Sequence, residues 1–231
     1  MDAIILAAGL GTRLRPHTLT TPKPLLPVRG RPILDWTLRA LPPAVGRVVV
    51  VTHYLAEQVE RYLRGQTHIP NWATVHQARP RGTGDAFRSC RGAVTADRVL
   101  VLNGDDLYAA ADLAALAAKP AGLLVRPVDQ PRKFGIAFTR PDGTVERLVE
   151  KPDLDGRHLA NIGAYVFPRE ALDIELPLSP RGEYEITDAV SALAARGPVY
   201  AVEAGVWLPI GDEAAWRAAE QLDLERLLLG R

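Results

Sequence analysis

The sequence predicts an α/β fold, in which a doubly wound, mostly parallel sheet is followed by an antiparallel extension. Two observations carry this prediction. Short apolar runs alternate with amphipathic stretches along the first 130 residues, which is the order that a parallel sheet with crossover helices requires. Further along, two strand-like runs flank Pro141-Asp142-Gly143, a strong hairpin signal, so antiparallel strands follow the parallel ones.

Local patterns predict each element of the parallel part. Five apolar runs predict buried strands at residues 3–8, 47–52, 73–77, 98–102 and 122–128. The stretches between them predict helices at 32–41, 55–63, 85–93 and 112–118. Pro32 suits the first position of its helix, because the N–H that proline lacks has no helical partner there.

The second half of the chain contains the antiparallel part. The sequence predicts strands at 136–139, 145–150 and 160–167, and helices at 186–195 and 212–229. The last helix is rich in alanine and leucine. Neither repeats nor a long linker divide the sequence, so we expect a single domain over residues 1–231.

Composition excludes several classes of function. The net charge is +1, which does not indicate the basic surface of a nucleic-acid-binding protein or the polybasic flank of a membrane anchor. No run of eighteen apolar residues and no signal peptide is found, so we expect a cytoplasmic protein with small-molecule partners. The single cysteine, Cys90, has no partner for an intrachain disulfide, and we interpret it as structural.

A glycine-rich loop follows the first predicted strand. Gly9-Leu10-Gly11-Thr12-Arg13 places flexible backbone at the carboxyl edge of the sheet, where amide groups can approach a phosphate. The spacing fits neither the dinucleotide fingerprint nor a P-loop. The loop runs on to Pro22-Lys23-Pro24, and its length of about 20 residues is typical of a functional loop. Arg13 and Lys23 are spaced to fold back over an anion, and the alternative is a solvated surface loop.

Taken together, LAAGLGTRLRP and TPKPLLPV resemble the signature of the sugar-nucleotide nucleotidyltransferases, a family with a Rossmann-like catalytic domain. The resemblance implies that the triphosphate half of the site lies here, with Arg13 and Lys23 as catalytic residues and Lys23 near the α-phosphate. In such a reaction a sugar phosphate attacks the α-phosphorus in line and pyrophosphate leaves, without a covalent nucleophile. The nucleotide-binding residues implied for this segment are Leu6, Ala8, Gly9, Gly11 and Thr12.

Two acids end the fourth predicted strand, in Asn103-Gly104-Asp105-Asp106. Carboxylates at a strand end beside a phosphate suit Mg²⁺, which takes one or two carboxylates together with substrate phosphates. The resemblance assigns the metal ligand to the first acid, so Asp105 is the third catalytic residue and the predicted magnesium ligand. The alternative is a turn whose aspartates cap a helix.

The base is expected between Gln77 and the segment that includes Gly82 and Thr83, which resembles the family's base-closing element. A glutamine amide can both donate to and accept from uracil or thymine, whereas the adjacent donors of guanine favour a carboxylate. We therefore expect UTP or dTTP in preference to GTP. The alternative is that Gln77 faces solvent.

The acceptor side is implied by three further elements of the resemblance. By that resemblance, Gly135 lets the sugar approach the backbone, Glu150 and Asn161 bind hydroxyls, and Lys151 contacts the sugar phosphate. Residues 1–130 are then mainly nucleotide-binding, and 131–231 mainly bind the sugar phosphate and carry the C-terminal helix.

One position of the matching sequence differs from the family pattern. Pro209 stands where the family has an aspartate that supplies a second magnesium ligand. Asp212 is a second candidate ligand, and its alternative role is to cap the last helix. This departure supports a competing hypothesis, a non-catalytic regulator that binds nucleotide sugars.

The leading hypothesis is uridylyl or thymidylyl transfer to a sugar 1-phosphate, as a monomer or homo-oligomer. Mannose-1-phosphate guanylyl transfer and phosphocholine cytidylyl transfer are the alternatives within the resemblance. No hexapeptide repeats that would build a left-handed β-helix are present, so a single activity is expected. The sequence decides neither the sugar nor the pathway.

Overall fold

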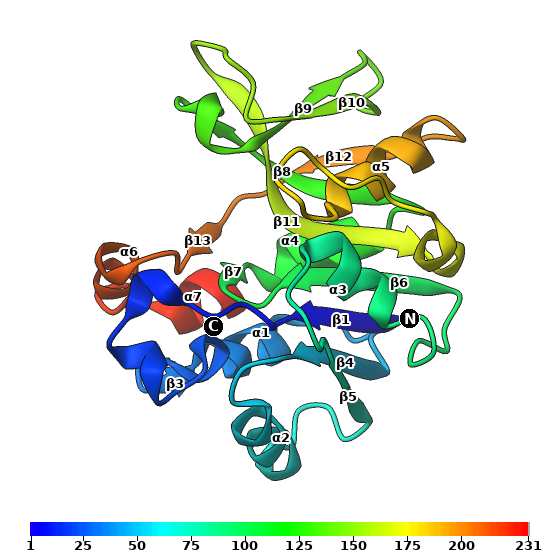
Figure 1. Ribbon diagram of the computed structural model, residues 1–231. Coiled ribbons are helices and arrows are strands. Elements are labelled where there is room, and N and C mark those ends of the chain that lie inside the picture. The colour runs from blue at the N-terminus through cyan, green and yellow to red at the C-terminus, as the bar shows by residue number, and fades with distance from the viewer. Residues whose placement is uncertain (231) are drawn as a thin grey trace.

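A mixed sheet of nine strands forms the centre of the computed structural model, which describes residues 1–230 (Figure 1). The order β10-β9-β11-β6-β1-β4-β5 makes up most of it, and β8 pairs with both β11 and β12. The strands are β1 (Asp2–Leu6), β4 (Arg47–Thr52), β5 (Trp72–His76), β6 (Arg98–Asn103), β8 (Gly122–Val128), β9 (Gly135–Thr139), β10 (Val145–Glu150), β11 (His158–Pro168) and β12 (Tyr200–Glu203).

Seven α-helices accompany the sheet in the described part of the chain. They are α1 (Ile33–Ala40), α2 (Ala56–Gly65), α3 (Thr83–Ser89), α4 (Ala110–Ala117), α5 (Ile186–Ala194), α6 (Glu213–Ala219) and α7 (Leu224–Leu229). Among residues 1–230, none of the helices has the length and apolar character needed to cross a membrane.

The parallel core is the set β6-β1-β4-β5, in which all neighbours run in the same direction. Ile4 pairs with Val49 on one side and with Val101 on the other, and all three are fully buried. Because side chains alternate along a strand, Ile4 faces one side of the sheet and Ile5 faces the other. Both faces are therefore apolar, which is typical of strands covered by helices on both sides.

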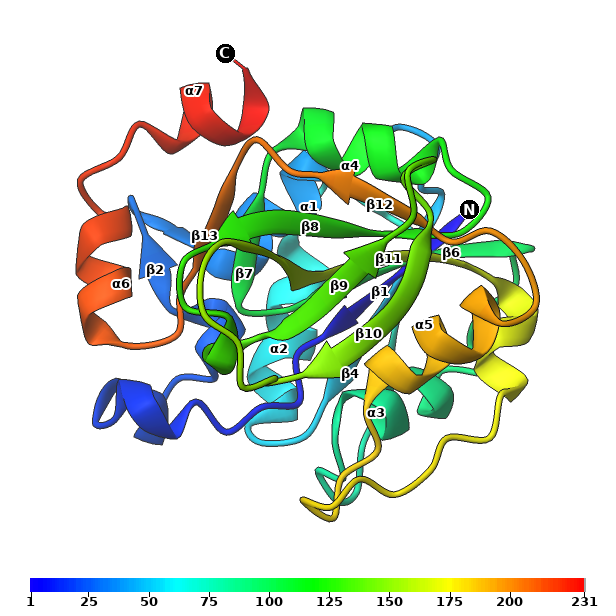
Figure 2. The same ribbon diagram turned by 90° about the horizontal axis from the view of Figure 1, so that it is seen from above.

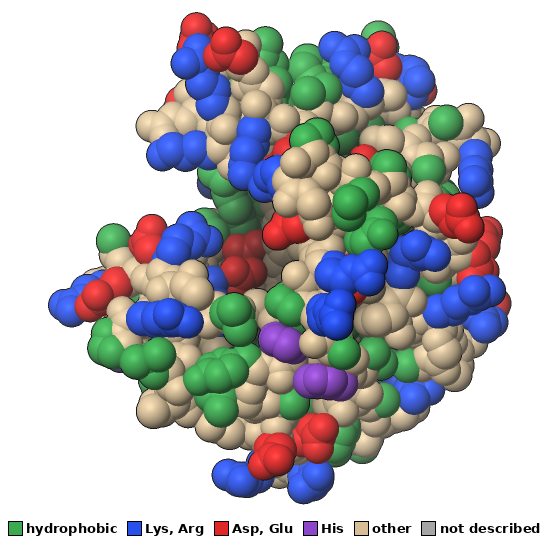
Figure 3. Space-filling view, viewed as in Figure 1, with side chains coloured by type: hydrophobic (Ala, Val, Ile, Leu, Met, Phe, Trp, Pro, Cys, Tyr) green, Lys and Arg blue, Asp and Glu red, His purple; other side chains and the backbone are tan. Residues whose placement is uncertain are grey.

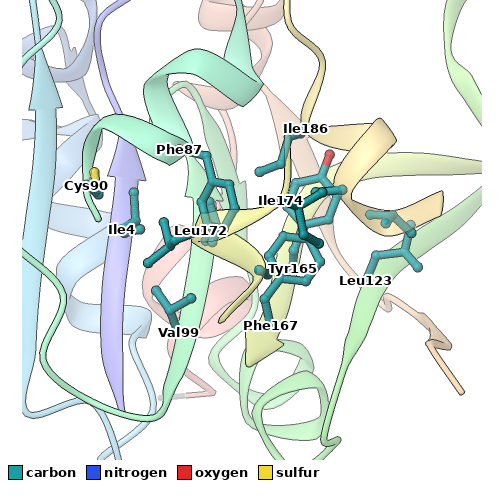
Figure 4. Close-up of a cluster of buried hydrophobic side chains, with 14 of the residues drawn as sticks. Ile4, Phe87, Cys90, Val99, Leu123, Tyr165, Phe167, Leu172, Ile174 and Ile186 are labelled. Carbon is teal, nitrogen blue, oxygen red and sulfur yellow. The ribbon is translucent and has the colours of Figure 1, made fainter. Parts of the chain in front are cut away.

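Helices cover the two faces of the sheet in separate groups. The helices α3 and α5 pack on one face, over a cluster in which the Phe87 and Phe167 rings lie 5.5 Å apart and Tyr165 stacks on Phe167 (Figure 4). The helices α1, α2 and α4 contribute to the cluster on the other face. This arrangement confirms the predicted doubly wound α/β fold with a mostly parallel centre.

The long strand β11 lies between the parallel core and β8, the strand that the sequence predicts at 122–128. It runs antiparallel to both β6 and β8, with Tyr165 opposite Val101 and Leu123. The pairing with β8 shifts register between Asn161 and Tyr165, so the strand bends there. The hairpin of β9 and β10 continues from β11 and projects from the body of the sheet (Figures 1 and 2).

The C-terminal helix expected at 212–229 is wrong in extent, because the structure has two short helices there. Asp212 caps α6 by accepting from the Ala215 N–H at 2.9 Å, and Asp223 caps α7 by accepting from the Arg226 N–H at 3.1 Å. A side-chain cap at Asp223 competes with a continuous helix, so the chain starts a new helix at this point.

Two details at the start of the chain also differ from expectation. The first strand ends at Leu6, so Ala8 lies in the loop that follows. Pro32 precedes α1 as its capping residue, in the short strand β3 (Arg31–Pro32), which pairs with β2 (Pro27–Val28).

Two more short strands, β7 (Asp106–Tyr108) and β13 (Trp207–Pro209), pair with each other, and their length of three residues leaves no sequence pattern.

Candidate active site

A pocket of ≈ 370 Å³ opens at the carboxyl ends of β1, β5 and β6. Figure 3 shows the hollow on this face of the molecule, with acidic side chains in its depth and basic ones along its rim. We call it the first pocket. Eight of the predicted residues line it, namely Leu6, Ala8, Gly9, Lys23, Gln77, Gly82, Thr83 and Asp105.

Gly11 shapes the loop and does not line the first pocket. Its φ of 61° lies in the left-handed region, where a side chain is unfavourable. A Cβ at Gly11 would lie 2.9 Å from Thr18 Cγ2 and 3.2 Å from Lys23 Cβ. The Thr18 hydroxyl also donates to the Gly11 carbonyl at 2.8 Å. Gly11 is therefore needed for the close packing that brings Lys23 under the loop.

Thr12 and Arg13 lie in the short 3-10 helix η1 (Thr12–Leu14), and neither lines the first pocket. The Arg13 guanidinium lies beside Gly211, because a Cβ added to Gly211 would be 3.7 Å from the two terminal nitrogens of Arg13. In the same loop, the His17 ring packs edge-on against Trp216 of α6 at 4.8 Å. The glycine-rich loop thus rests on the C-terminal segment, and Arg13, unlike Lys23 and Asp105, does not line the first pocket.

Lys23 and Asp105 are in direct contact. Lys23 Nζ donates to Asp105 Oδ2 at 2.6 Å. The lysine side chain is 8% exposed and the aspartate side chain is 41% exposed, so the ammonium is held below the pocket surface and the carboxylate reaches into the pocket. The two segments that the sequence analysis assigned to phosphate and metal binding therefore meet at one point.

Asp106 lies next to Asp105 but is buried, and it was not among the predicted site residues. Burial, together with the neighbouring carboxylate of Asp105, raises the pKa of Asp106 to about 8. Its Oδ2 accepts from Asn103 Nδ2 at 3.1 Å and lies 3.3 Å from the Tyr108 hydroxyl. The residue before the two acids, Gly104, has no room for a side chain, because a Cβ there would lie 2.7 Å from the Leu6 carbonyl oxygen.

Gln77 is 5% exposed and does not face bulk solvent. Its Nε2 donates to Asp85 Oδ2 at 2.7 Å and, less closely, to the Gly82 carbonyl at 3.4 Å. Gly82 has a φ of 105°, and a Cβ on it would lie 2.3 Å from the Tyr184 carbonyl oxygen. The turn that closes this side of the pocket therefore requires glycine.

A second pocket of ≈ 240 Å³ adjoins the first, and Thr83 and Asn103 line both. Of the predicted acceptor residues, Gly135, Glu150 and Asn161 line this second pocket. Lys151 does not, and its Nζ lies 3.9 Å from Glu150 Oε1. The two pockets share Thr83 and Asn103, so two substrates bound in them would lie next to each other.

Asn161 is held in place by its neighbours in β11. Its Nδ2 donates to the Tyr165 hydroxyl at 2.8 Å, and its Oδ1 accepts from the Gly163 N–H at 3.2 Å. Gly163 has a φ of 79°, and a Cβ there would lie 1.9 Å from Asn103 Nδ2. This glycine lets β11 pass the side chain that lies between the two pockets.

Aromatic rings of the second pocket were not among the predicted site residues. Phe134 and Trp207 pack edge to face at 5.6 Å, and both line the pocket. Trp207 comes from β13, which pairs with β7. Because the long-range pairing of a three-residue strand leaves no local pattern, the sequence alone does not predict that Trp207 lines this pocket.

Pro209, where the sequence departs from the family signature, lies beside the two acids. Pro209 stands opposite Asp106 in the pairing of β13 with β7, and the next residue, Ile210, donates its N–H to the Asp105 carbonyl at 3.0 Å. An aspartate at position 209 would thus begin beside the two acids, whereas the Asp212 side chain is used as the cap of α6.

The residues fit a magnesium ion that is shared with a substrate. Asp105 offers a half-exposed carboxylate in the first pocket, of which Oδ2 contacts Lys23. Within residues 1–230, no group of three or more His, Cys, Asp or Glu side chains is arranged to hold a metal by itself. This donor set suits Mg²⁺, which commonly binds through one or two carboxylates and completes its shell with phosphates and water.

Comparisons with known proteins agree with this geometry. The model of the nucleotidyl transferase family matches residues 2–226. The chain is 32% identical to the bifunctional protein GlmU of Methanocaldococcus jannaschii, over 91% of this chain and 51% of that protein. It is also 32% identical to the mannose-1-phosphate guanyltransferase beta-A of Xenopus laevis, over 91% of this chain and 61% of that protein. The chain thus spans between about half and about three fifths of the length of these curated relatives.

A solved structure shares the fold over nearly the whole length of both chains. It belongs to a Bacillus anthracis protein described as a glucose-1-phosphate thymidylyltransferase, in complex with sucrose. The TM-score is 0.81 at 27% identity, and the match covers 95% of this chain and 94% of the other.

Proposed function

The chain belongs to the nucleotidyl transferase family, and on this basis we propose that it transfers a nucleotidyl group from a nucleoside triphosphate to a sugar 1-phosphate, releasing pyrophosphate and forming a nucleotide sugar. The observation that carries the proposal is the contact of Lys23 with Asp105 at 2.6 Å, beside a second pocket that adjoins the first. An ammonium and a carboxylate at this junction suit a reaction between two phosphates.

The chain's residues supply positioning and charge. The acceptor phosphate is already ionised near neutral pH, so no general base is required for its attack on the α-phosphorus. Lys23 is buried by its neighbours, and a cation held in a partly desolvated site stabilises developing negative charge more strongly than one in water. Fixing both substrates in adjoining pockets replaces a collision between two free molecules, which removes much of the entropic barrier.

Magnesium is the proposed cofactor. Asp105 would hold it, and the ion supplies neutralisation of charge on the phosphates. Asp212 is a weaker candidate, because its carboxylate is already used as the cap of α6. Asp106 is also a weaker candidate than Asp105, because its carboxylate is buried and its Oδ2 already accepts from Asn103 Nδ2 at 3.1 Å.

UTP or dTTP is the proposed nucleotide. Gln77 in the first pocket supports a base with a ring N–H donor, and the likeness to a structure described as a thymidylyltransferase favours uracil or thymine over guanine. Guanylyl transfer to mannose 1-phosphate is the second candidate, and the relative from Xenopus laevis favours it. Cytidylyl transfer to phosphocholine and a non-catalytic nucleotide-sugar-binding regulator are further alternatives.

We also propose how the parts of the chain divide this work. Residues 1–130 mainly bind the nucleotide, and residues 131–231 mainly bind the sugar phosphate, within one domain and in a cytoplasmic setting. Four residues depart from the division, since Glu183 lines the first pocket, and Thr83, Asn103 and Asp106 line the second.

A matrix of substrates tests the proposal. Each of UTP, dTTP, GTP and CTP is paired with glucose 1-phosphate, N-acetylglucosamine 1-phosphate, mannose 1-phosphate and phosphocholine, and pyrophosphate release is followed with and without Mg²⁺. We expect release with UTP or dTTP and a sugar 1-phosphate, only when Mg²⁺ is present. Tight nucleotide binding without release in any pair would identify a regulator instead of an enzyme.

A further inference from the structure

We propose that Asp85 is a positioning residue that fixes the amide of Gln77 with its carbonyl oxygen toward the nucleobase, so that the site selects bases with a ring N–H donor. The inference rests on the proposed function, because it assumes that the first pocket binds the base of a nucleoside triphosphate. It adds Asp85 to the residues that determine which base binds, and it states which bases are preferred, neither of which follows from the presence of Gln77 alone.

The orientation of the Gln77 amide follows from what its partners can accept. Nε2 donates to Asp85 Oδ2 at 2.7 Å and lies 3.4 Å from the Gly82 carbonyl oxygen. An ionised carboxylate and a carbonyl accept hydrogen bonds but cannot donate them. Turning the amide over would place its oxygen against two acceptors, so the bond to Asp85 selects one orientation.

The two hydrogens of this amide are therefore both directed at protein acceptors. What the side chain can still offer is Oε1, which accepts no hydrogen bond from the described residues 1–230 and belongs to a residue that lines the first pocket. A glutamine free to turn could serve as donor or acceptor. Held by Asp85, Gln77 serves as an acceptor only.

The supporting backbone is also held in place. The Gln77 N–H donates to the Thr52 carbonyl at 2.8 Å, and the Gln77 carbonyl lies 2.8 Å from His53 Nδ1. On the other side, Asp85 lies in the first turn of α3, where Gly84 N–H donates to the Tyr184 carbonyl at 2.8 Å. Both partners of the hydrogen bond thus sit on anchored segments, which is required for a fixed amide to discriminate between ligands.

An acceptor in this position favours one class of base. Uracil and thymine carry an N–H at ring position 3, and guanine carries one at ring position 1. Cytosine and adenine carry a lone pair at the corresponding ring nitrogen, which would face the lone pairs of Oε1. A buried polar group left without a partner is costly, so a site that accepts from an N–H rejects a base that lacks it.

Four variants test the role of Asp85: D85N, Q77E, the swap Q77E/D85N, and the control D97N. Asparagine at position 85 can donate or accept, so D85N frees the Gln77 amide to turn. In the swap, the new amide at position 85 donates to the new carboxylate at position 77, which keeps an oxygen directed at the base. D97N makes the same charge change at an exposed residue, which precedes β6 at the end of the sheet away from the pocket.

The readout is the dissociation constant of each protein for UTP and for CTP, measured by calorimetry. The expected result for D85N is a fall in the preference for UTP over CTP by about tenfold or more, the factor that one hydrogen bond commonly supplies. The swap restores the preference, and D97N leaves it unchanged. An unchanged UTP to CTP ratio in a folded D85N protein would overturn the proposal, as would equal weakening of both nucleotides.

A measurement on the unmodified protein keeps the inference testable if a variant does not fold. In 3-deazauridine triphosphate a C–H replaces the ring N–H, and we expect it to bind about tenfold or more weakly than UTP. Equal affinity would overturn the inference while leaving the transferase proposal intact. If no nucleoside triphosphate binds the unmodified protein, both proposals fail.

Discussion

Lys23 Nζ lies 2.6 Å from Asp105 Oδ2, which joins two segments that are 82 residues apart in the sequence. The lysine is nearly buried, while the aspartate remains open to the first pocket. The contact therefore has two functions in our account. It holds the ammonium at the level of the phosphates, and it leaves one side of the carboxylate available to a cation.

Replacing Lys23 by alanine is expected to lower turnover by about a hundredfold or more, because it removes charge stabilisation at the reacting phosphates. Lys119→Ala is the matched control, since Lys119 lies against the Tyr200 ring, outside both pockets. Rates of pyrophosphate release at saturating substrates check the prediction. Turnover that falls equally in both variants would show that Lys23 has no special role.

Replacing Glu150 by glutamine is expected to raise KM for the sugar 1-phosphate by about tenfold and to leave KM for the nucleotide unchanged, because hydrogen bonds to a charged group are worth about 1.5–3 kcal/mol. Glu150 lines the second pocket, whereas Glu146, on the same strand, does not. Steady-state kinetics of E150Q and E146Q give the comparison. An effect of E150Q on the nucleotide alone would place the acceptor elsewhere.

Gly163→Ala is expected to destabilise the protein more than Gly156→Ala does. Both glycines have a positive φ, at 79° and 84°, so both substitutions incur the same conformational cost of about 1–2 kcal/mol. At Gly163 alone the new Cβ would meet Asn103, at 1.9 Å from Nδ2, which adds about 1–3 kcal/mol of overpacking. Urea unfolding of both variants measures the difference, and equal losses would remove Asn103 from the explanation.

Asp212→Ala is expected to cost about 1 kcal/mol of stability through the lost helix cap. Asp212→Asn keeps a side-chain oxygen for the Ala215 N–H and should retain most of that stability. If Asp212 is only a cap, the Mg²⁺ concentration that gives half-maximal activity stays the same in both variants. A rise in that concentration in D212N would make Asp212 a metal ligand.

The parallel core could be predicted from the sequence because each of its strands is a separate apolar run. Arg47–Thr52 in this core has the same bounds in the prediction and in the structure, and so does Gly122–Val128, which lies outside the core. The order of strands could not be predicted, because β11 enters between β6 and β8 by pairings between distant segments. The break before α7 was missed because an alanine- and leucine-rich periodicity continues through it, whereas the cap at Asp223 depends on one side chain.

The candidate site was accessible to sequence analysis where residues lie directly after strands. Gln77 and Asp105 follow β5 and β6 closely and line the first pocket, because the carboxyl ends of parallel strands meet at one edge of the sheet. Lys23 lines the same pocket from the far end of the loop that follows β1. Arg13 and Lys151 line neither pocket, and their expected contacts with phosphates stay predictions.

The interaction partners within the site could not be predicted. The bond of Gln77 to Asp85 depends on how α3 packs beside the end of β5, and no spacing along the chain encodes it. Asp106 was passed over because a pair of adjacent acids does not reveal which one is buried. Its raised pKa follows from tertiary packing around β7.

The most direct test of the central claim follows the α-phosphate. The protein is incubated with Mg²⁺, a sugar 1-phosphate, and UTP or dTTP labelled at the α-phosphate, and the labelled products are separated. Our account predicts that the label appears in a nucleotide sugar, in equal amount to the pyrophosphate released. Label that stays in the triphosphate, or that appears only in the nucleoside monophosphate, would contradict transfer to a sugar phosphate.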